Sequence, residues 1–247
     1  MIDPLMLPSV LRQRLSRRDA LALLGKNVAC LATASLLWPR RAAASGSDPL
    51  CVVRPAQTEG PYFVDEQLNR SDIRSDPTEG AIKPGTPLAL TVVVSRIGGG
   101  TCRPLEGAHV DIWHCDAMGL YSDVEDPRFN TTGHKFLRGY QITDAKGEAR
   151  FLTIYPGWYE GRTVHIHVKV RTAPIAGKSF EFTSQMYFDD TFTDRVYAAA
   201  PYASRGPRTA RNQDDRIFRR GGDQLILAPT PTTAGYAATF AIGLQLS

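Results

Sequence analysis

Cysteine is scarce in this chain of 247 residues, and none of its four cysteines has the Cys-x-x-Cys spacing. This absence argues against the common zinc and dithiol redox sites and favours buried structural cysteines. Cys30 lies near the N-terminus, so Cys51, Cys102 and Cys115 remain, which permits one disulfide and one free thiol. Cys102 and Cys115 are one candidate pair, although a straight strand between them would hold them too far apart. The connectivity therefore stays open.

Long apolar runs, helical periodicity and sequence repeats are also largely missing. Beyond residue 44 no stretch is long and apolar enough to cross a bilayer, so we expect a soluble mature protein without a membrane span. The glycines do not form a phosphate-binding loop, and no serine lies in a nucleophile elbow. These absences argue against a P-loop nucleotide site and against a serine hydrolase of the α/β type.

The first 44 residues have the order of an export signal: a basic region, an apolar stretch over residues 20–38, and a run of small residues that allows cleavage after Ala44. Residues 16–21, with Arg17 and Arg18, resemble a twin-arginine signal. We therefore expect a periplasmic or extracellular protein whose mature domain spans residues 45–247. An amphipathic N-terminal helix is the alternative, and a lipoprotein site at Cys30 fits poorly because Asn27 is unsuited to that motif.

The net charge of +4 belongs to this leader, because residues 1–44 hold seven Lys/Arg and two Asp/Glu. The remainder carries 22 positive and 23 negative residues. A basic loop over residues 193–222 is interrupted by Asp214 and Asp215, so a solvated loop or subunit contact is favoured over nucleic-acid binding.

Short β-rich segments with frequent turns dominate the mature chain. They predict an all-β fold, an antiparallel β-sandwich with long loops and little helix. Residues 45–85 are predicted to form an extended arm, residues 144–147 the turn of a hairpin, and residues 191–199 a short helix. The strands are predicted at residues 88–95, 107–114, 136–143, 149–154, 163–170, 180–188, 224–228 and 236–246.

His165 and His167 are the first candidates for a functional site. Side chains two apart on a strand point to the same face, so both imidazoles can bind one metal ion. Tyr159 precedes His165 by six residues, after a Pro-Gly turn, and Tyr121 follows the strand that ends near Trp113. Two histidines leave a metal under-coordinated, so these tyrosines are candidate further ligands.

Taken together, these segments resemble the intradiol ring-cleavage dioxygenases, the family of catechol and protocatechuate dioxygenases. The Trp-to-Tyr and Tyr-Arg-His-x-His spacings carry the resemblance, which covers roughly residues 58–190 in the family's order. The matching blocks are residues 107–113 with Gly119 and Tyr121, Arg138-Gly139 with Thr143-Asp144 and Gly147, Thr153-Ile154 with Pro156-Gly157, Tyr159, Arg162 and His165-Ile166-His167, and Thr183-Ser184-Gln185.

The resemblance implies a non-haem Fe(III) held by Tyr121, Tyr159, His165 and His167. It further implies cleavage of a catechol by O2 between its hydroxyl-bearing carbons, giving a cis,cis-muconate-type diacid. Tyr159 would leave the iron and help accept a proton, and Arg162 would stabilise the carbanion-like ring. The catalytic residues that the resemblance implies are Tyr159, Arg162 and Gln185. Phenolates at neutral pH require a strongly charged cation, which agrees with ferric iron.

Two other functions compete with this interpretation. One is a non-catalytic β-sandwich binding module, and the other is a zinc hydrolase, which has no need of paired phenolates. The histidines off the family's ligand positions, His109, His114 and His134, are interpreted as structural, and Trp113 as core packing. The helical dimerisation segment of the catechol dioxygenases is missing, so a homo-oligomer is left open. The short Tyr159–His165 connection leaves the identity of the catechol open as well.

Overall fold

A computed structural model describes residues 51–174 and 177–246. The predicted export signal and Cys30 therefore lie outside the described residues. Among the helices in the described ranges, none has the length and apolar character needed to cross a bilayer.

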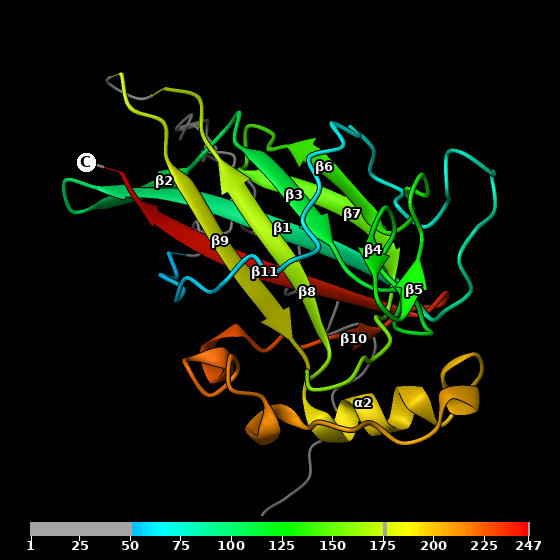
Figure 1. Ribbon diagram of the computed structural model, residues 1–247. Helices are drawn as coiled ribbons and strands as arrows, with labels where there is room; N and C mark the ends of the chain where they lie inside the picture. Colours follow the sequence, from blue (N-terminus) through cyan, green and yellow to red (C-terminus); the bar gives the residue numbers. More distant parts are fainter. Residues whose placement is uncertain (1–50, 175–176, 247) are drawn as a thin grey trace, which may run out of the picture. The chain divides into compact units, whose positions relative to one another are not determined.

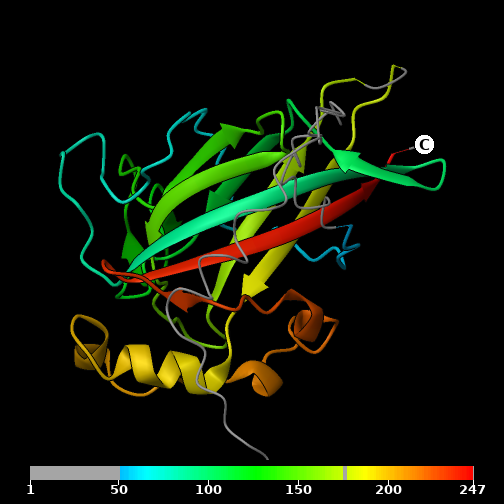
Figure 2. The same cartoon turned by 180° about the vertical axis from the view of Figure 1, so that it is seen from behind.

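Two β-sheets form the body of the described domain, with one in front of the other in Figure 1 and the order reversed in Figure 2. The five-stranded sheet contains β1 (Pro87–Gly98), β2 (Thr101–Pro104), β7 (Glu148–Ile154), β10 (Thr230–Pro231) and β11 (Tyr236–Gln245). The four-stranded sheet has the order β6 (Arg138–Ile142), β3 (His109–Trp113), β8 (His165–Arg171) and β9 (Glu181–Tyr187). A small ribbon joins β4 (Glu125–Asp126) to β5 (Phe129–Asn130).

The predicted β-sandwich is confirmed, and its hydrophobic core lies between the sheets. Alternate residues of β1 and β8 belong to one buried cluster, because side chains of a strand point to opposite faces in turn. On β8 these are Ile166, Val168 and Val170, so His165 and His167 lie on the other face of the four-stranded sheet. Pairings between named strands are antiparallel except that of β1 with β11, which is parallel.

The predicted hairpin of residues 136–143 with 149–154 is wrong. Its tight turn exists, since the amide of Gly147 donates to the carbonyl of Asp144 across 2.8 Å. However, β6 pairs with β3 and β7 pairs with β1, so the turn carries the chain from one sheet to the other. The other edge of each strand pairs with the arm instead of with its neighbour in sequence, because the amide of Tyr140 donates to the carbonyl of Leu68 and that of Leu152 to the carbonyl of Ser71, both across 2.8 Å.

The single α-helix in the described ranges, α2 (Asp190–Tyr197), confirms the predicted short helix at residues 191–199. Its N-cap is Asp189, whose carboxylate accepts a hydrogen bond from the amide of Phe192 at 2.8 Å. The strand predicted at residues 224–228 is wrong, because Gly222–Leu225 forms a 3-10 helix. Gly221 precedes it with φ 94°, a left-handed conformation that glycine adopts without strain.

Two further short 3-10 helices, Tyr202–Arg205 and Asn212–Asp214, follow α2. Figure 1 shows this region, in yellow and orange, at the end of the sandwich where β9 finishes. The predicted basic loop is held partly by internal ion pairs: Arg208 contacts Asp190 at 2.6 Å and Asp194 at 2.7 Å.

The arm before β1 contains turns and isolated bridges but no named strand, as predicted. Figure 1 shows its first part, in blue and cyan, crossing the four-stranded sheet on the face that carries the histidines. The amide of Gln57 donates to the carbonyl of Thr183 on β9 across 2.9 Å, and Tyr62 and Phe63 pack with aromatic residues of that face. The arm therefore covers the histidine pair.

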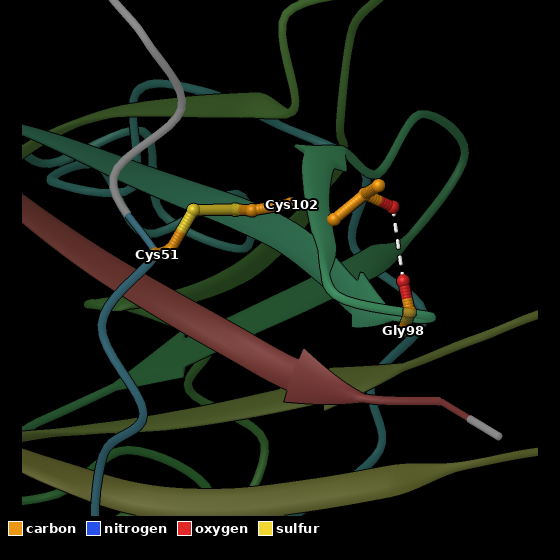
Figure 3. The surroundings of a disulfide bond; sticks show 4 residues. Cys51, Gly98 and Cys102 are labelled. Carbon is orange, nitrogen blue, oxygen red and sulfur yellow. Dashed lines mark hydrogen bonds between the residues drawn. A yellow bond between two sulfur atoms is a disulfide. The ribbon is translucent and has the colours of Figure 1, made fainter.

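A disulfide joins the start of the arm to the β1–β2 hairpin. Cys51 and Cys102 are bonded, with Cα atoms 6.1 Å apart, and Cys115 is a free, buried thiol. Figure 3 shows the bond beside the hairpin, whose Thr101 hydroxyl donates to the carbonyl of Gly98 at 2.9 Å. One disulfide and one free thiol is the division that the odd cysteine count allowed, whereas the candidate pairing of Cys102 with Cys115 is wrong.

Candidate metal centre

The two histidines of β8 lie side by side and are almost fully buried, each with 2% of its surface exposed. Their Nε2 atoms are 3.1 Å apart. The Nδ1 atom of His165 is 2.6 Å from the carbonyl oxygen of Thr163, which can only accept, so Nδ1 carries the proton and Nε2 presents a lone pair. Burial lowers the pKa of both imidazoles well below the ordinary value, which keeps them neutral and able to bind a cation.

Both predicted tyrosine ligands converge on the same nitrogen. The hydroxyl oxygen of Tyr159 is 3.2 Å from Nε2 of His165, and that of Tyr121 is 3.5 Å from it. Tyr159 comes from the loop after β7, and Tyr121 from the loop after β3. Four donor atoms from three segments therefore surround one point on the outer face of the sheet.

Two glycines bring the tyrosine loops together. Gly119 has φ +82°, and a Cβ on it would lie 2.2 Å from the carbonyl oxygen of Trp158. A Cβ on Gly157 would lie 2.4 Å from the carbonyl oxygen of Asp116. The carboxylate of Asp116 also orders its own loop by accepting from the amide of Leu120 at 3.0 Å. Backbone packs directly on backbone here, so no other residue type fits without displacing a tyrosine loop.

Aromatic side chains enclose the four donor atoms. The ring of Tyr62, from the arm, lies 4.6 Å from that of Tyr121, and Trp113 stacks on His167 with ring centroids 4.8 Å apart and planes inclined by 7°. Phe63 packs on the indole of Trp113 at 4.8 Å. Trp113 is thus packing, as expected, but it packs against a candidate ligand. The sequence assigned no role to Tyr62.

Arg162 lies directly beside the donor atoms. Its Nη1 donates to the hydroxyl of Tyr159 across 3.4 Å and lies 3.5 Å from Nε2 of His165. Burial alone would lower the pKa of this guanidinium, but nearby Tyr159 and Asp215 raise it overall, so Arg162 is a permanent positive charge at the site.

Gln185 contacts Arg162 from the neighbouring strand. It lies opposite His167 on β9, has no exposed surface, and accepts from Nη2 of Arg162 at 2.5 Å. Its amide nitrogen donates to the carbonyl of Thr58 in the arm at 2.8 Å, and Tyr187 donates to its oxygen at 2.9 Å. The three residues predicted to be catalytic, Tyr159, Arg162 and Gln185, therefore form one connected group.

Asp215 completes this group and was missed from the sequence. Its carboxylate accepts from Nε of Arg162 at 2.8 Å and from the backbone amides of Thr163 and Ile217 at 3.0 and 2.7 Å. Asp215 is 1% exposed. In the sequence it appeared only as an acidic interruption of a basic loop, and no local signal links it to an arginine 53 positions earlier.

The donor set fits a ferric ion. Without a cation, burial raises the pKa of both Tyr121 and Tyr159, so both phenols stay protonated. A tripositive ion at their meeting point would reverse this by stabilising two phenolates, and neutral imidazoles would complete the set.

Nδ1 of His167 is buried without a hydrogen-bond partner among the described residues, so no hydrogen bond at Nδ1 holds this ring in place.

The other histidines lie away from these atoms. His114 is buried, with Nδ1 2.8 Å from the carbonyl of Cys115 and Nε2 2.6 Å from the hydroxyl of Thr153. His109 stacks on Tyr140 at 3.8 Å. His134 contacts Asp76 at 2.9 Å near Glu79, a cluster at the surface in which Asp76 also accepts from the Thr78 hydroxyl.

A cleft of about 340 Å³ opens beside Tyr159. Its walls combine aromatic and charged side chains from the arm, both tyrosine loops, the β4–β5 ribbon and the segment after α2. The lining residues are Tyr62, Gly119, Leu120, Arg128, Phe129, Trp158, Tyr159, Glu160, Arg205 and Thr209.

Comparison with known proteins places these features in context. A family profile described as dioxygenase matches residues 58–214. The protocatechuate 3,4-dioxygenase beta chain of Burkholderia cepacia is 32% identical over 171 residues, which cover 65% of this chain and 67% of that one. An intradiol ring-cleavage dioxygenase from Tetranychus urticae superposes with a TM-score of 0.67 at 29% identity, covering 79% of this chain and 95% of that one. The dioxygenase domain of a carbohydrate-binding fusion from Streptomyces sp. SirexAA-E gives 0.56 at 30% identity, covering 79% and 100%.

Proposed function

This chain belongs to the intradiol ring-cleavage dioxygenase family, and we propose that it is a non-haem Fe(III) enzyme that cleaves a catechol between its two hydroxyl-bearing carbons. The products would be cis,cis-muconate-type diacids that contain both atoms of O2. The observation that carries the proposal is the convergence of two phenol oxygens and Nε2 of His167 on Nε2 of His165.

Tyr121, Tyr159, His165 and His167 would hold the iron, which when bound supplies the positive charge that activates a catecholate toward O2. Tyr159 is the more exposed of the two tyrosines and borders the cleft, whereas Tyr121 is 1% exposed. A diol entering from the cleft therefore meets Tyr159 first. We propose that Oη of Tyr159 takes a proton from a substrate hydroxyl.

Arg162 has two tasks in this proposal. Its Nη1 contacts Oη of Tyr159, so it stabilises negative charge on that oxygen before the substrate proton arrives. The guanidinium does not supply that proton itself, because arginine stays protonated. Negative charge that develops on a ring bound beside Tyr159 would also lie close to this guanidinium. Gln185 and Asp215 fix two other edges of the guanidinium, which leaves Nη1 directed at the site.

The aromatic enclosure and the arm limit the access of bulk water. Tyr62 covers Tyr121, Trp113 covers His167, and Phe63 packs on Trp113. A dry surrounding strengthens the electrostatic effect of Arg162 and protects reactive species from hydrolysis before ring cleavage is complete.

We also propose that the protein is exported, on the basis of the N-terminal signal pattern. The disulfide between Cys51 and Cys102 supports this, because disulfides persist mainly in oxidising compartments. Fusing residues 1–44 to a reporter that is active only after export tests the signal, and replacing Arg17 and Arg18 by lysine tests the twin-arginine route.

The decisive experiment combines metal analysis, absorbance and oxygen uptake. Iron-loaded protein should show a visible phenolate-to-iron absorption band and consume O2 with catechol. Tyr159→Phe should weaken and shift the band, and His165→Ala should abolish iron binding. Tyr236→Phe, on β11 in the other sheet, is the matched control that should change neither. A colourless protein with a full complement of iron would contradict the proposal, and metal-independent ligand binding would favour a non-catalytic binding module.

A further inference from the structure

The cleft beside Tyr159 extends past the metal centre, because it is lined by residues of the β4–β5 ribbon and of the segment after α2. At about 340 Å³ it lies in the size range of pockets that bind small molecules. Resting on the proposed function, we propose that this cleft binds a side chain on the catechol ring, and that the side chain ends in a carboxylate bound by Arg205.

Arg205 is held in place but is not neutralised. Its Nε donates to the carbonyl of Trp158 across 2.9 Å, and its guanidinium carbon lies 4.5 Å from the centre of the Trp158 ring. In the described part of the chain no carboxylate lies within 4.0 Å of this guanidinium, and neither Nη atom has a hydrogen-bond partner. Two fixed, uncommitted donors on a planar cation match the two oxygens of a carboxylate.

Besides Arg205, one cation and two carboxylates lie in or beside the cleft, and they contact one another. Arg128 contacts Asp126 at 3.0 Å, and this carboxylate also accepts from the hydroxyl of Tyr62 at 2.8 Å. Glu160 lies 4.0 Å from Arg128 and has 78% of its side chain exposed, so water screens it from a ligand. Arg205 is therefore the cation of this cleft that no carboxylate of the described residues contacts.

The remaining walls suit a flat, unsaturated linker. Trp158, Phe129 and Tyr62 present aromatic surface, and Leu120 adds an aliphatic contact. Gly119 permits the close approach of Arg205, because a Cβ there would lie 2.8 Å from Nη2 of Arg205. The glycine that joins the tyrosine loops thus also brings the cation next to the proposed ring site.

Binding to iron-free protein tests the cleft without turnover. The ligands are benzoate, phenylacetate and cinnamate, each paired with its neutral amide, and the readout is the intrinsic tryptophan fluorescence, to which Trp158 in the cleft contributes. At least one acid should bind about tenfold more tightly than its amide, and Arg205→Gln should remove this difference. Arg219→Gln is the control, because Arg219 is exposed and outside the cleft. Equal binding of every acid and its amide to the unaltered protein would overturn the proposal, whatever happens to the variant.

Turnover gives a second, independent readout. Catechols that carry the same three acids or amides at position 4 should show a preference for one acid over its amide of at least about tenfold in kcat/KM. Arg205→Gln should bring that ratio close to one, and Arg205→Lys should keep part of it. Turnover of all catechols without an acid preference would overturn the carboxylate site and leave the proposed function standing. Arg205-dependent binding of an acid without any oxygen uptake would support the carboxylate site and contradict the proposed function.

Discussion

Nε of Arg162 donates to Oδ2 of Asp215 across 2.8 Å, and the two residues are 53 positions apart in the chain. This contact joins the loop that carries Tyr159 to the segment after α2. Gln185 binds one edge of the guanidinium and Asp215 binds another, and together they keep Nη1 directed at Tyr159. Without Asp215, only the contact with Gln185 would hold this orientation. Asp215 is therefore a positioning residue for the proposed reaction.

Asp215→Asn should lower kcat by about 10- to 100-fold, the range found when partners of active-site ligands are removed. The amide keeps the shape but gives up the charge and one acceptor. Steady-state oxygen uptake checks this, with iron content measured in parallel. Asp214→Asn is the control, since Asp214 is exposed and contacts the amide of Arg211 instead. Equal activity in both variants would remove Asp215 from the mechanism.

Gly119→Ala should impair the metal centre more than Gly133→Ala does. Both residues have positive φ, +82° and +90°, so both substitutions carry backbone strain of about 1–2 kcal/mol. A Cβ at Gly119 also meets the carbonyl of Trp158, whereas nothing lies within 4 Å of one at Gly133. We expect Gly119→Ala to lose the visible absorption band or shift it, and Gly133→Ala to keep it. Identical spectra would show that the loops tolerate the displacement.

His114 should contribute to acid destabilisation. Burial lowers its pKa from 6.5 to about 4 in the folded protein. Below pH 6.5 the unfolded chain binds a proton that the folded chain excludes, so stability falls as the pH drops from about 6.5 to about 4. The full loss is about 3 kcal/mol for a shift of this size. Urea unfolding of iron-free protein at several pH values should give a shallower acid slope for His114→Gln. Parallel curves would contradict the shift.

Removing the disulfide should destabilise the fold more than the site. Cys51 and Cys102 close a loop of 51 residues, for which chain entropy predicts about 4 kcal/mol. A Cys51→Ser, Cys102→Ser double variant should therefore unfold at lower denaturant concentration and keep its absorption band once folded. An unchanged unfolding midpoint in the double variant would show that the arm is held by other contacts.

Local periodicity predicted most of the β-strands, the short helix and the shared face of His165 and His167. These features depend on side-chain direction and on capping, which a few neighbouring residues determine. The candidate ligands were also identified from sequence, by spacing and by a family resemblance, and the structure brings all four together.

Only the tertiary structure decided which partners these segments take. The turn at Asp144 leads from one sheet to the other, although its sequence is also that of a hairpin, because the flanking strands pair with β1 and β3 and their other edges pair with the arm. The pairing of Arg162 with Asp215 and the free donors of Arg205 depend in the same way on segments far apart in the chain. Local residues determine direction and conformation, whereas contacts between distant segments form only when the whole core closes.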